Sequence, residues 1–416
     1  MISQSNIESL YNCIKCGLCL AACPVYKHLL EETAAPRGKI QLLKALQHQK
    51  VAPSRYLEEI ASRCLLCHSC AAVCPSGMET GHLIAALRTE MRNAFGLEWK
   101  KKLAFRYLLS EKGHLGLALQ GARVLRPLLP PKTKLAGSAI SGFPSIPPKA
   151  LHDQVPERIR PSGSVIRTTV AFFPGCMIDY IYPEIGLSLI SLLNALGVEV
   201  ILPQDLVCCG TPLLISGEHE ILAQNLRHNL ARLSSLQVEA IVTACASCGH
   251  TLKKEYAYLL RELGEEDSLA LEVGAKVQDI SQFLMGREEE IRELLGPLSL
   301  CLTYHDPCHL AKGQGVRAEP RALLRSIPEM SFLEMAEADA CCGGGGSFQF
   351  YFPEISRPIV GAKVENIRRT EAQVVATGCP ACILRLESIL ERDRSQMEVL
   401  HTVQVLERSM RGRRQR

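Results

Sequence analysis

The sequence lacks any long apolar run and has little aromatic content or net charge. Phe, Tyr and Trp make up 5% of its 416 residues, with a single tryptophan, and the formal net charge is +4. A charge this small gives no sign of a nucleic-acid partner. The longest suggestive apolar stretch, Ile185 to Val198, falls short of the roughly 18 residues that a membrane span requires. We therefore expect a buried helix there and a soluble protein.

Export signals are lacking as well. Met1 to Tyr11 contains neither a basic n-region nor an apolar h-region. The chain nevertheless has 19 cysteines and 47% hydrophobic residues. Clustered cysteines without an export signal favour metal binding in a reducing compartment over disulfides. We expect two or three domains at this length and a cytoplasmic protein, with a peripheral position on the inner face of the cell membrane as the alternative.

One cysteine pattern is written twice near the start of the chain. It reads C-x2-C-x2-C-x3-C-P, first from Cys13 to Pro24 and again from Cys64 to Pro75. This is the bacterial ferredoxin pattern for [4Fe–4S] cubane clusters, in which the fourth cysteine ligates the other cluster. Structural zinc on C-x2-C pairs is the alternative. We assign one cluster to Cys13, Cys16, Cys19 and Cys74, and a second to Cys23, Cys64, Cys67 and Cys70.

The segment between the two runs favours helix. Lys39 to His48 has apolar residues at helical spacing, and we interpret Pro36-Arg37-Gly38 as a breaker just ahead of it. Residues 1–97 are therefore predicted to form an α-helical ferredoxin module. Basic residues near the cysteines would raise a cluster's potential, but we favour a merely solvated face for them: Lys15, His28, Arg37 and Lys39.

Residues 98–164 differ in composition. Between Glu98 and Lys134, nine basic residues stand against two acidic ones, and apolar residues are interleaved with them. Such a stretch can lie on an anionic membrane surface or dock a partner subunit, although packing on its own protein is the interpretation we favour. Eight of the 23 prolines fall between Pro127 and Pro161. We expect an extended linker there.

The remainder of the chain is an internal repeat. Each copy contains a lone cysteine, a Cys-Cys-Gly triplet and a C-x2-C pair, and the interval between corresponding cysteines of the two copies is nearly constant. We place the repeat domains at 165–290 and 297–412. The candidate metal ligands are Cys176, Cys208, Cys209, Cys245 and Cys248 in the first copy, and Cys308, Cys341, Cys342, Cys379 and Cys382 in the second.

Strand and helix signals alternate within each copy. We expect strands at 170–173, 199–202 and 240–243 in the first copy, and at 300–304, 331–334 and 373–377 in the second. This alternation predicts a tandem α/β fold with parallel sheets. The cysteines then follow the carboxyl ends of strands, where open α/β sheets place their sites. Cys245 and Cys379 precede helices, whose N-termini lower a thiol's pKa.

Five thiolates exceed the four ligands of a zinc site, so an iron–sulfur assembly fits each repeat best. A redox-active dithiol and structural zinc with a spare cysteine stay open. Gly343 to Gly346 lacks the lysine of a phosphate loop and suits close backbone approach to a metal. Beside Cys308, we expect hydrogen bonding to the site, with proton relay as the alternative, from His305, Asp306 and His309. We interpret Cys301 as a core residue.

The paired ferredoxin runs followed by two Cys-Cys-Gly repeats resemble the iron–sulfur subunit of glycolate oxidase. Lactate-utilisation iron–sulfur proteins and the catalytic subunits of heterodisulfide reductase share the repeats. The similarity extends over essentially the whole chain, including Pro36 to Ile40 and Leu252 to Tyr256. The resemblance implies two cubane clusters and one or two further, non-cubane clusters at the repeats. It also implies an FAD-linked oxidase subunit as partner, with a further electron-transfer subunit as an additional candidate.

We therefore expect an electron-transfer subunit of a flavin-dependent glycolate or lactate dehydrogenase. The chain has no G-x-G-x-x-G dinucleotide fingerprint after a strand, so the flavin belongs on another chain, and we assign no catalytic residue for the hydroxyacid to this one. Both repeats are complete in cysteine, which keeps a heterodisulfide-type thiol–disulfide reductase open as the alternative. A zinc-stabilised interaction protein is the third hypothesis.

Overall fold

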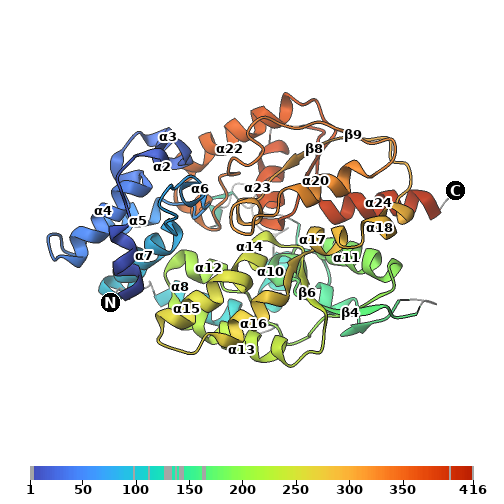
Figure 1. Cartoon of the computed structure of the whole chain (residues 1–416), viewed down its shortest axis with the longest axis horizontal. Helices are drawn as coiled ribbons and strands as arrows, with labels where there is room; N and C mark the ends of the chain where they lie inside the picture. Colours follow the sequence, from blue (N-terminus) through green and yellow to red (C-terminus); the bar gives the residue numbers. More distant parts are fainter. Residues whose placement is uncertain are drawn as a thin grey trace.

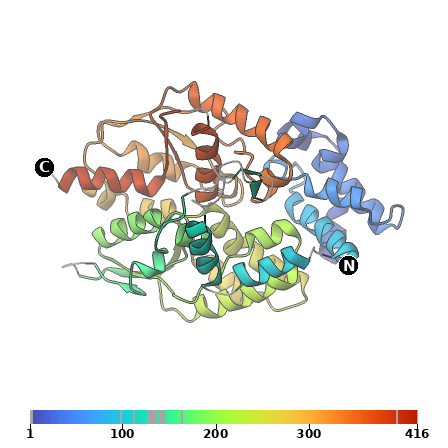
Figure 2. The ribbon, with the colours of Figure 1, turned by 180° about the vertical axis from the view of Figure 1, so that it is seen from behind.

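The computed structural model describes residues 4–96, 99–110, 113–125, 134–135, 138–139, 145–161, 165–392 and 395–414. Three parts follow one another along the chain (Figure 1). Helices drawn in blue form one end, and two α/β units, one green to yellow and one orange to red, form the rest. The two chain ends lie at opposite ends of the molecule in Figure 1 and Figure 2.

Within its described residues, the N-terminal part consists of helices joined by loops and has no strand, as predicted. Its helices pack around a small core that includes Leu10, Leu43, Leu57 and Leu87. The elements are α1 (Gln4–Tyr11), α2 (Leu18–Ala22), α3 (Pro24–Leu29), η1 (Glu32–Ala34), α4 (Pro36–Gln47), α5 (Arg55–Ser62), α6 (Ser69–Ala72) and α7 (Thr80–Phe95).

The breaker expected ahead of α4 is wrong in one respect, because the helix starts at Pro36 itself. Proline is favoured in the first helical turn, where its missing N–H would have no intrahelical partner. Gly38 is needed in this turn for a different reason. A Cβ at Gly38 would lie 1.9 Å from the Glu32 carbonyl oxygen, so the helix can approach the preceding 3-10 turn only with glycine there.

The first α/β unit contains a five-stranded sheet. Its strand order is β3-β5-β4-β6-β7, with β3 antiparallel and the others parallel. The strands are β3 (Arg158–Ile159), β4 (Thr168–Phe172), β5 (Val198–Ile201), β6 (Ala240–Thr243) and β7 (Val277–Asp279). Strand β3 belongs to the proline-rich segment, and no pattern in that segment indicated that it would join the sheet.

The second α/β unit repeats the first. Its four parallel strands have the order β9-β8-β10-β11, which matches β5-β4-β6-β7 strand for strand. They are β8 (Cys301–His305), β9 (Ser331–Phe332), β10 (Val374–Thr377) and β11 (Glu398–His401). The internal repeat read from cysteine spacing is therefore also a repeat of sheet topology. Cys301 is half-buried at the start of β8, so it is not the core residue we expected.

Helices cover both sheets and share one continuous apolar core. In the first unit they are α10 (Gly175–Tyr180), α11 (Pro183–Ala195), α12 (Thr211–Ser216), α13 (His219–Ser234), α14 (Ala246–His250), η5 (Thr251–Glu255), α15 (Tyr256–Glu262), α16 (Ser268–Lys276), α17 (Ile280–Met285) and α18 (Glu288–Leu294). In the second unit they are α19 (Cys308–Ala311), α20 (Ala318–Arg325), α21 (Phe348–Tyr351), α22 (Pro353–Arg368), α23 (Pro380–Leu390) and α24 (Thr402–Arg414).

The basic segment contributes α8 (Trp99–Leu109) and α9 (His114–Leu125). The first of these packs on the first α/β unit: Lys102 forms an ion pair with Glu220 at 2.9 Å, and the Leu109 carbonyl accepts a hydrogen bond from Asn225. Short pieces follow at β1 (Lys134–Leu135), β2 (Ser138–Ala139) and η4 (Leu151–Asp153). Most of the stretch from 126 to 144, which includes much of the predicted linker, lies outside the described residues.

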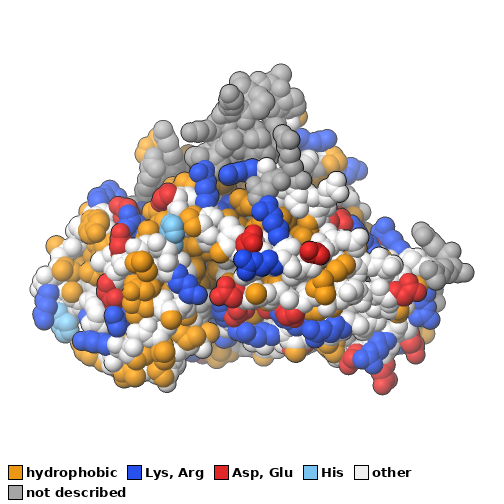
Figure 3. Space-filling view, turned by 90° about the horizontal axis from the view of Figure 1, so that it is seen from above, with side chains coloured by type: hydrophobic (Ala, Val, Ile, Leu, Met, Phe, Trp, Pro, Cys, Tyr) orange, Lys and Arg blue, Asp and Glu red, His pale blue; other side chains and the backbone are white. Residues whose placement is uncertain are grey.

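Surface and hydropathy give two further facts. Over the described part of the face in Figure 3, basic and acidic side chains are interspersed, in keeping with the small net charge. Among the helices that the structure describes, none combines the length and the apolar character needed to cross a bilayer.

Candidate metal centres

The two ferredoxin loops have the same backbone. Lys15 and Gly17 in the first loop and Leu66 and His68 in the second all have positive φ, between 49° and 86°. Left-handed backbone is uncommon for residues other than glycine. Its recurrence at equivalent positions of both runs means that the two loops fold around their cysteines in one way. That shape suits each loop to hold a ligand of the same kind.

The second ferredoxin set gathers across the sequence. Burial, together with the adjacent Cys64 and Cys67 thiols, raises the pKa of Cys23 to about 12. Burial also raises the pKa of Cys70, with Cys67, Cys64 and Cys23 as its neighbours. The fourth cysteine of the first run thus lies with the first three of the second run, as the crossed assignment requires.

The other set gathers less tightly. Burial raises the pKa of Cys19, and its neighbours are Cys13 and Cys16. Cys74 and Cys13 both pack against the core of the helical part. Cys23 packs instead in a separate apolar cluster with Cys67. The fourth cysteine of each run therefore packs in a different group of apolar side chains, together with a cysteine of the other run.

Lys39 is not on a solvated face, contrary to our expectation. It is 1% exposed, and its ammonium donates a hydrogen bond to the Ala34 carbonyl. Burial lowers its pKa, while the nearby thiols of Cys64 and Cys23 oppose that shift. A buried cation beside four cysteines would offset the negative charge of thiolates held there.

The five cysteines of the first repeat form a chain of contacts. Cys208 contacts Cys176 and Cys209, Cys209 contacts Cys248, and Cys248 contacts Cys245. All of them except Cys176 are buried. Thr211 adds a hydroxyl 3.2 Å from the Cys209 sulfur. Adjacent cysteines at the Cys-Cys-Gly turn therefore both face the same centre.

The second repeat reproduces this chain in the same order. Cys341 contacts Cys308 and Cys342, and Cys382 contacts Cys342 and Cys379. The sulfurs of Cys342 and Cys382 lie 3.6 Å apart. As in the first repeat, only the lone cysteine of the pattern is partly exposed.

Two contacts join the sets into one series. Cys245 of the first repeat contacts Cys379 of the second, and Cys341 contacts Cys67 of the ferredoxin module. The hydrogen bond from Cys341 lowers the pKa of Cys67 to about 6. A continuous run of thiols therefore leads from the second ferredoxin set, through the second repeat, to the first repeat.

The thiol pKa that we expected to be lowered at two helix N-termini is lowered at Cys379 but not at Cys245. The pKa of Cys379 is well below that of a free thiol, because Cys245 and Cys382 hydrogen-bond to its thiolate and backbone amides of α23 assist them. At Cys245, the hydrogen bond that Cys248 donates favours the thiolate. The hydrogen bond that Cys245 itself donates to Cys379, together with burial, outweighs this effect and raises the pKa of Cys245. The prediction for Cys245 is wrong because its thiol donates to Cys379.

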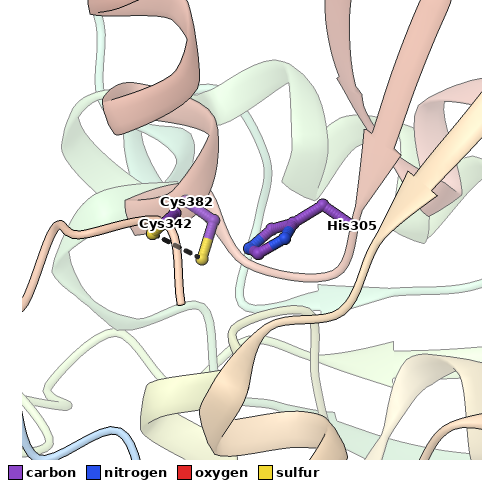
Figure 4. Close-up of side chains that lie close together, drawn as sticks. All are labelled: His305, Cys342 and Cys382. Atoms are coloured by element: carbon purple, nitrogen blue, oxygen red, sulfur yellow. Dashed lines mark hydrogen bonds between the residues drawn. The ribbon is translucent and has the colours of Figure 1, made fainter. Parts of the chain in front are cut away.

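The polar residues near Cys308 have different surroundings. Asp306 accepts two hydrogen bonds from Arg321, at 2.8 and 2.7 Å. His309 contacts the Ser247 hydroxyl and the Leu66 carbonyl, at 3.0 and 3.1 Å. His305 faces the sulfurs of Cys342 and Cys382 (Figure 4). Asp306 therefore fixes the loop, and His309 bridges all three parts of the molecule.

Histidines gather where the three parts meet. The ring centroid of His68 lies 4.5 Å from that of His250 and 5.3 Å from that of His309, and the rings of His250 and His309 are stacked. His250 also contacts the buried carboxylate of Glu255, as does His82 of α7. Burial would raise the pKa of Glu255, but its hydrogen bonds with the two histidines hold it well below the usual range.

Arg88 and Lys312 fasten the ferredoxin module to the repeats. The buried guanidinium of Arg88 donates to the Cys64 carbonyl and, across the junction, to the Ile215 carbonyl, both at 2.7 Å. Lys312 donates to Ser69 and to the Asp339 carbonyl, at 2.9 and 2.6 Å. These bonds hold the loop of the second ferredoxin set against both repeats.

A cavity of about 490 Å³ opens beside Cys341. It lies between α3 and α6 of the ferredoxin module and α22 of the second repeat. Four cationic side chains and two carboxylates line it: Lys27, Lys312, Arg317, Lys363, Glu337 and Asp339. Burial lowers the pKa of Lys363 to about 8. The cavity therefore gives small molecules access to a cysteine of the second repeat.

Sequence reasoning missed His68, His82, His250, Glu255 and Arg88. A weak signal existed for two of them, since His68 directly follows Cys67 and His250 closely follows Cys248. These residues come together only because the ferredoxin module packs against repeats that are distant from it in the sequence.

Similarity to known proteins agrees with this arrangement. A family model described as "4Fe-4S dicluster domain" matches residues 9–78, and one described as "Cysteine-rich domain" matches 170–253 and 302–387. A "Probable glycolate oxidase iron-sulfur subunit" of Bacillus subtilis (strain 168) is 31% identical over 404 residues, covering 92% of this chain and 90% of the relative. The chain belongs to this family of iron–sulfur subunits.

Other members of the family have different names. A CoM/CoB fumarate reductase subunit of Methanothermobacter marburgensis is 32% identical over 413 residues, covering 97% of this chain and 73% of that protein. A dihydromethanophenazine:CoB–CoM heterodisulfide reductase subunit of Methanosarcina acetivorans is 26% identical, covering 92% and 89%. All are oxidoreductase subunits, and this iron–sulfur subunit is one as well.

One solved structure supports the fold alone. A hypothetical protein from Helicobacter pylori superposes with a TM-score of 0.54 at 11% identity, over 98% of this chain and 73% of that one.

The donor chemistry of this iron–sulfur subunit fits clusters at the ferredoxin loops. Two sets of cysteines lie in loops of matching left-handed backbone, and one fourth cysteine, Cys23, lies beside the other run's loop. At each repeat, five sulfurs linked in a chain of contacts exceed what one tetrahedral zinc ion takes. Iron–sulfur clusters are therefore supported as cofactors of this subunit.

Proposed function

We propose that this iron–sulfur subunit transfers electrons within a flavin-dependent 2-hydroxyacid dehydrogenase that acts on glycolate or lactate. A separate FAD-linked subunit oxidises the hydroxyacid, and this chain carries the electrons to a downstream acceptor. The observation that carries the proposal is the unbroken series of thiols from Cys67 through Cys341 and Cys379 to Cys245. A series of metal sites in contact is what an electron relay needs.

The proposed ligands are the eighteen cysteines of the four sets. Cys13, Cys16, Cys19 and Cys74 would hold one cubane, and Cys23, Cys64, Cys67 and Cys70 the other. Each repeat would hold a further cluster on its five cysteines. Bound clusters supply one-electron chemistry, whose potential depends on nearby charge, hydrogen bonds and burial. Here Lys39, Arg88 and the helix N-terminus at Cys379 supply those influences.

The flavin requirement follows from the electron count. A 2-hydroxyacid gives up two electrons as a hydride, and iron–sulfur clusters accept electrons singly, so a flavin must divide the pair. We expect the purified chain alone to show no glycolate or lactate dehydrogenase activity. Adding its flavoprotein partner should let substrate bleach the cluster absorbance. Oxidation of hydroxyacid by the chain alone, without flavin, would contradict the proposal.

A second candidate function is reduction of a small anionic disulfide at the second repeat. The cavity beside Cys341 favours it, because that cavity has more cations than carboxylates and reaches a cysteine of the series. Two electrons and two protons would convert the disulfide to two thiols. Dithiodiglycolate, reduced by the dithionite-treated chain alone, is a suitable probe. Turnover that disappears in Lys363→Met but survives without the flavoprotein would favour this function over the first.

A further inference from the structure

The two repeats differ in the residue that precedes the lone cysteine by three positions. His305 ends β8 just before Cys308, and Phe173 holds the equivalent position before Cys176. Both side chains are fully buried. A Cβ at Gly175 would meet both the Cys248 sulfur and the Phe173 ring, at 2.5 and 3.8 Å, so Phe173 borders the first site. An imidazole therefore replaces a phenyl ring at the second.

The imidazole of His305 lies within reach of two thiols. One ring nitrogen and the sulfurs of Cys342 and Cys382 all lie within 4.8 Å of one another (Figure 4). Donor atoms this close can share a single metal ion, since metal–nitrogen and metal–sulfur bonds are about 2.0 to 2.3 Å long. Among the described residues, no cysteine of the first repeat belongs to a comparable group of three potential metal ligands.

Outside the metal site, the ring nitrogens of His305 are also unpaired. Neither Nδ1 nor Nε2 meets the geometry of a hydrogen bond with a described residue, although the side chain has no solvent exposure. The polar group with which the imidazole interacts is the Cys342 thiol, at the site itself. A buried polar atom without a partner costs about 1 to 3 kcal/mol. Such a cost is expected where the atom binds a ligand in the functional protein.

The backbone around His305 is held firmly. His305 pairs with Thr377 of β10 in the parallel register. The next residue, Asp306, donates its backbone N–H to the Ala338 carbonyl at 3.0 Å and is held by Arg321. The imidazole is therefore presented to the sulfurs by a strand end and not by a loose loop.

We propose that His305 is a nitrogen donor to the metal centre of the second repeat, whereas Phe173 offers no donor at the equivalent position of the first. This rests on the proposed presence of a cluster at the second repeat. A neutral imidazole adds a donor atom to this site without adding negative charge to that of the cysteine thiolates.

The test is nitrogen-resolved electron paramagnetic resonance on the full chain, reconstituted anaerobically with iron and sulfide. The second-repeat signal is the one that Cys342→Ser removes. We expect it to carry a hyperfine coupling that changes when histidine is labelled with ¹⁵N and disappears in His305→Phe, which installs the residue of the first repeat. Iron content should be retained in His305→Phe and in His305→Gln, because the five cysteines of the site remain.

The matched control is Phe173→Leu, which should leave the second-repeat signal unchanged. A second-repeat signal in the wild-type chain without histidine coupling would overturn the inference and leave the proposed relay intact. Absence of any signal that depends on Cys342 would overturn both. The measurement on labelled wild-type protein decides the matter even if a His305 variant does not fold.

Discussion

Replacing Cys341 and Cys342 together by serine should stop electron transfer from the ferredoxin module to the first repeat. These residues lie between Cys67 on one side and Cys382 and Cys379 on the other. Without the second-repeat centre, no contact among the described thiols connects the second ferredoxin set with the first repeat. We take the flavoprotein to deliver its electrons to the ferredoxin module. With flavoprotein and hydroxyacid present, the ferredoxin signals should then still be reduced, while reduction of the first-repeat signal should fall to background.

The readout is freeze-quenched electron paramagnetic resonance of the assembled complex. Cys301→Ser is the matched control, because Cys301 is half-buried at the opposite end of β8 from the site and belongs to none of the four sets. It should behave as the wild type does. Undiminished reduction of the first-repeat signal in the double variant would show that electrons reach it by another path.

The second large effect concerns the crossed ferredoxin ligands. Cys23→Ser should remove the cluster held by Cys64, Cys67 and Cys70, since Cys23 is buried beside those thiols. The loss should be about four irons, the content of one cubane. The cluster on Cys13, Cys16 and Cys19 should remain.

Cys74→Ser should give the converse result, with loss of the cluster at the first loop. Combining each substitution with Cys64→Ser separates the two cases. Adding Cys23→Ser to Cys64→Ser should cause no further loss of iron, because both cysteines serve the same cluster. Adding Cys74→Ser to Cys64→Ser should remove about four irons more. Iron analysis and spectra of these single and double variants test this. If Cys23→Ser spares the cluster that depends on Cys64, each run binds its own cluster and the crossed assignment fails.

Much of the fold could be predicted because its signals are local. Short cysteine spacings determined the ferredoxin loops, and the nearly constant interval between corresponding cysteines revealed the repeat. Alternating strand and helix patterns predicted parallel sheets, which have the same strand order in both units. In each of these cases a short stretch of chain dictates its own structure.

The errors arise where packing outweighs local preference. Lys39 has the composition of a surface residue, but the fold buries it near Cys64 and Cys23. Pro36 is not a breaker, because the first turn of a helix accepts proline readily. The thiol of Cys245 departs from the helix N-terminus rule because it donates a hydrogen bond to Cys379, a cysteine of the other repeat.

The order of the sites could not be predicted from the sequence. Chain order places the first repeat beside the ferredoxin module, whereas contact between Cys67 and Cys341 places the second repeat there. This contact joins residues that are far apart in the chain, and nothing in the spacing of either motif specifies it. The same holds for Arg88, which joins Cys64 to Ile215.

Iron content tests the central claim most directly. Four centres of four irons each give on the order of 16 iron atoms per chain in protein prepared without oxygen. We expect that value for the wild-type chain, and about four fewer for Cys341→Ser/Cys342→Ser. A fully loaded wild-type chain with about eight irons, the content of two cubanes, would contradict the account, because the ten repeat cysteines would then hold no clusters and could not relay electrons.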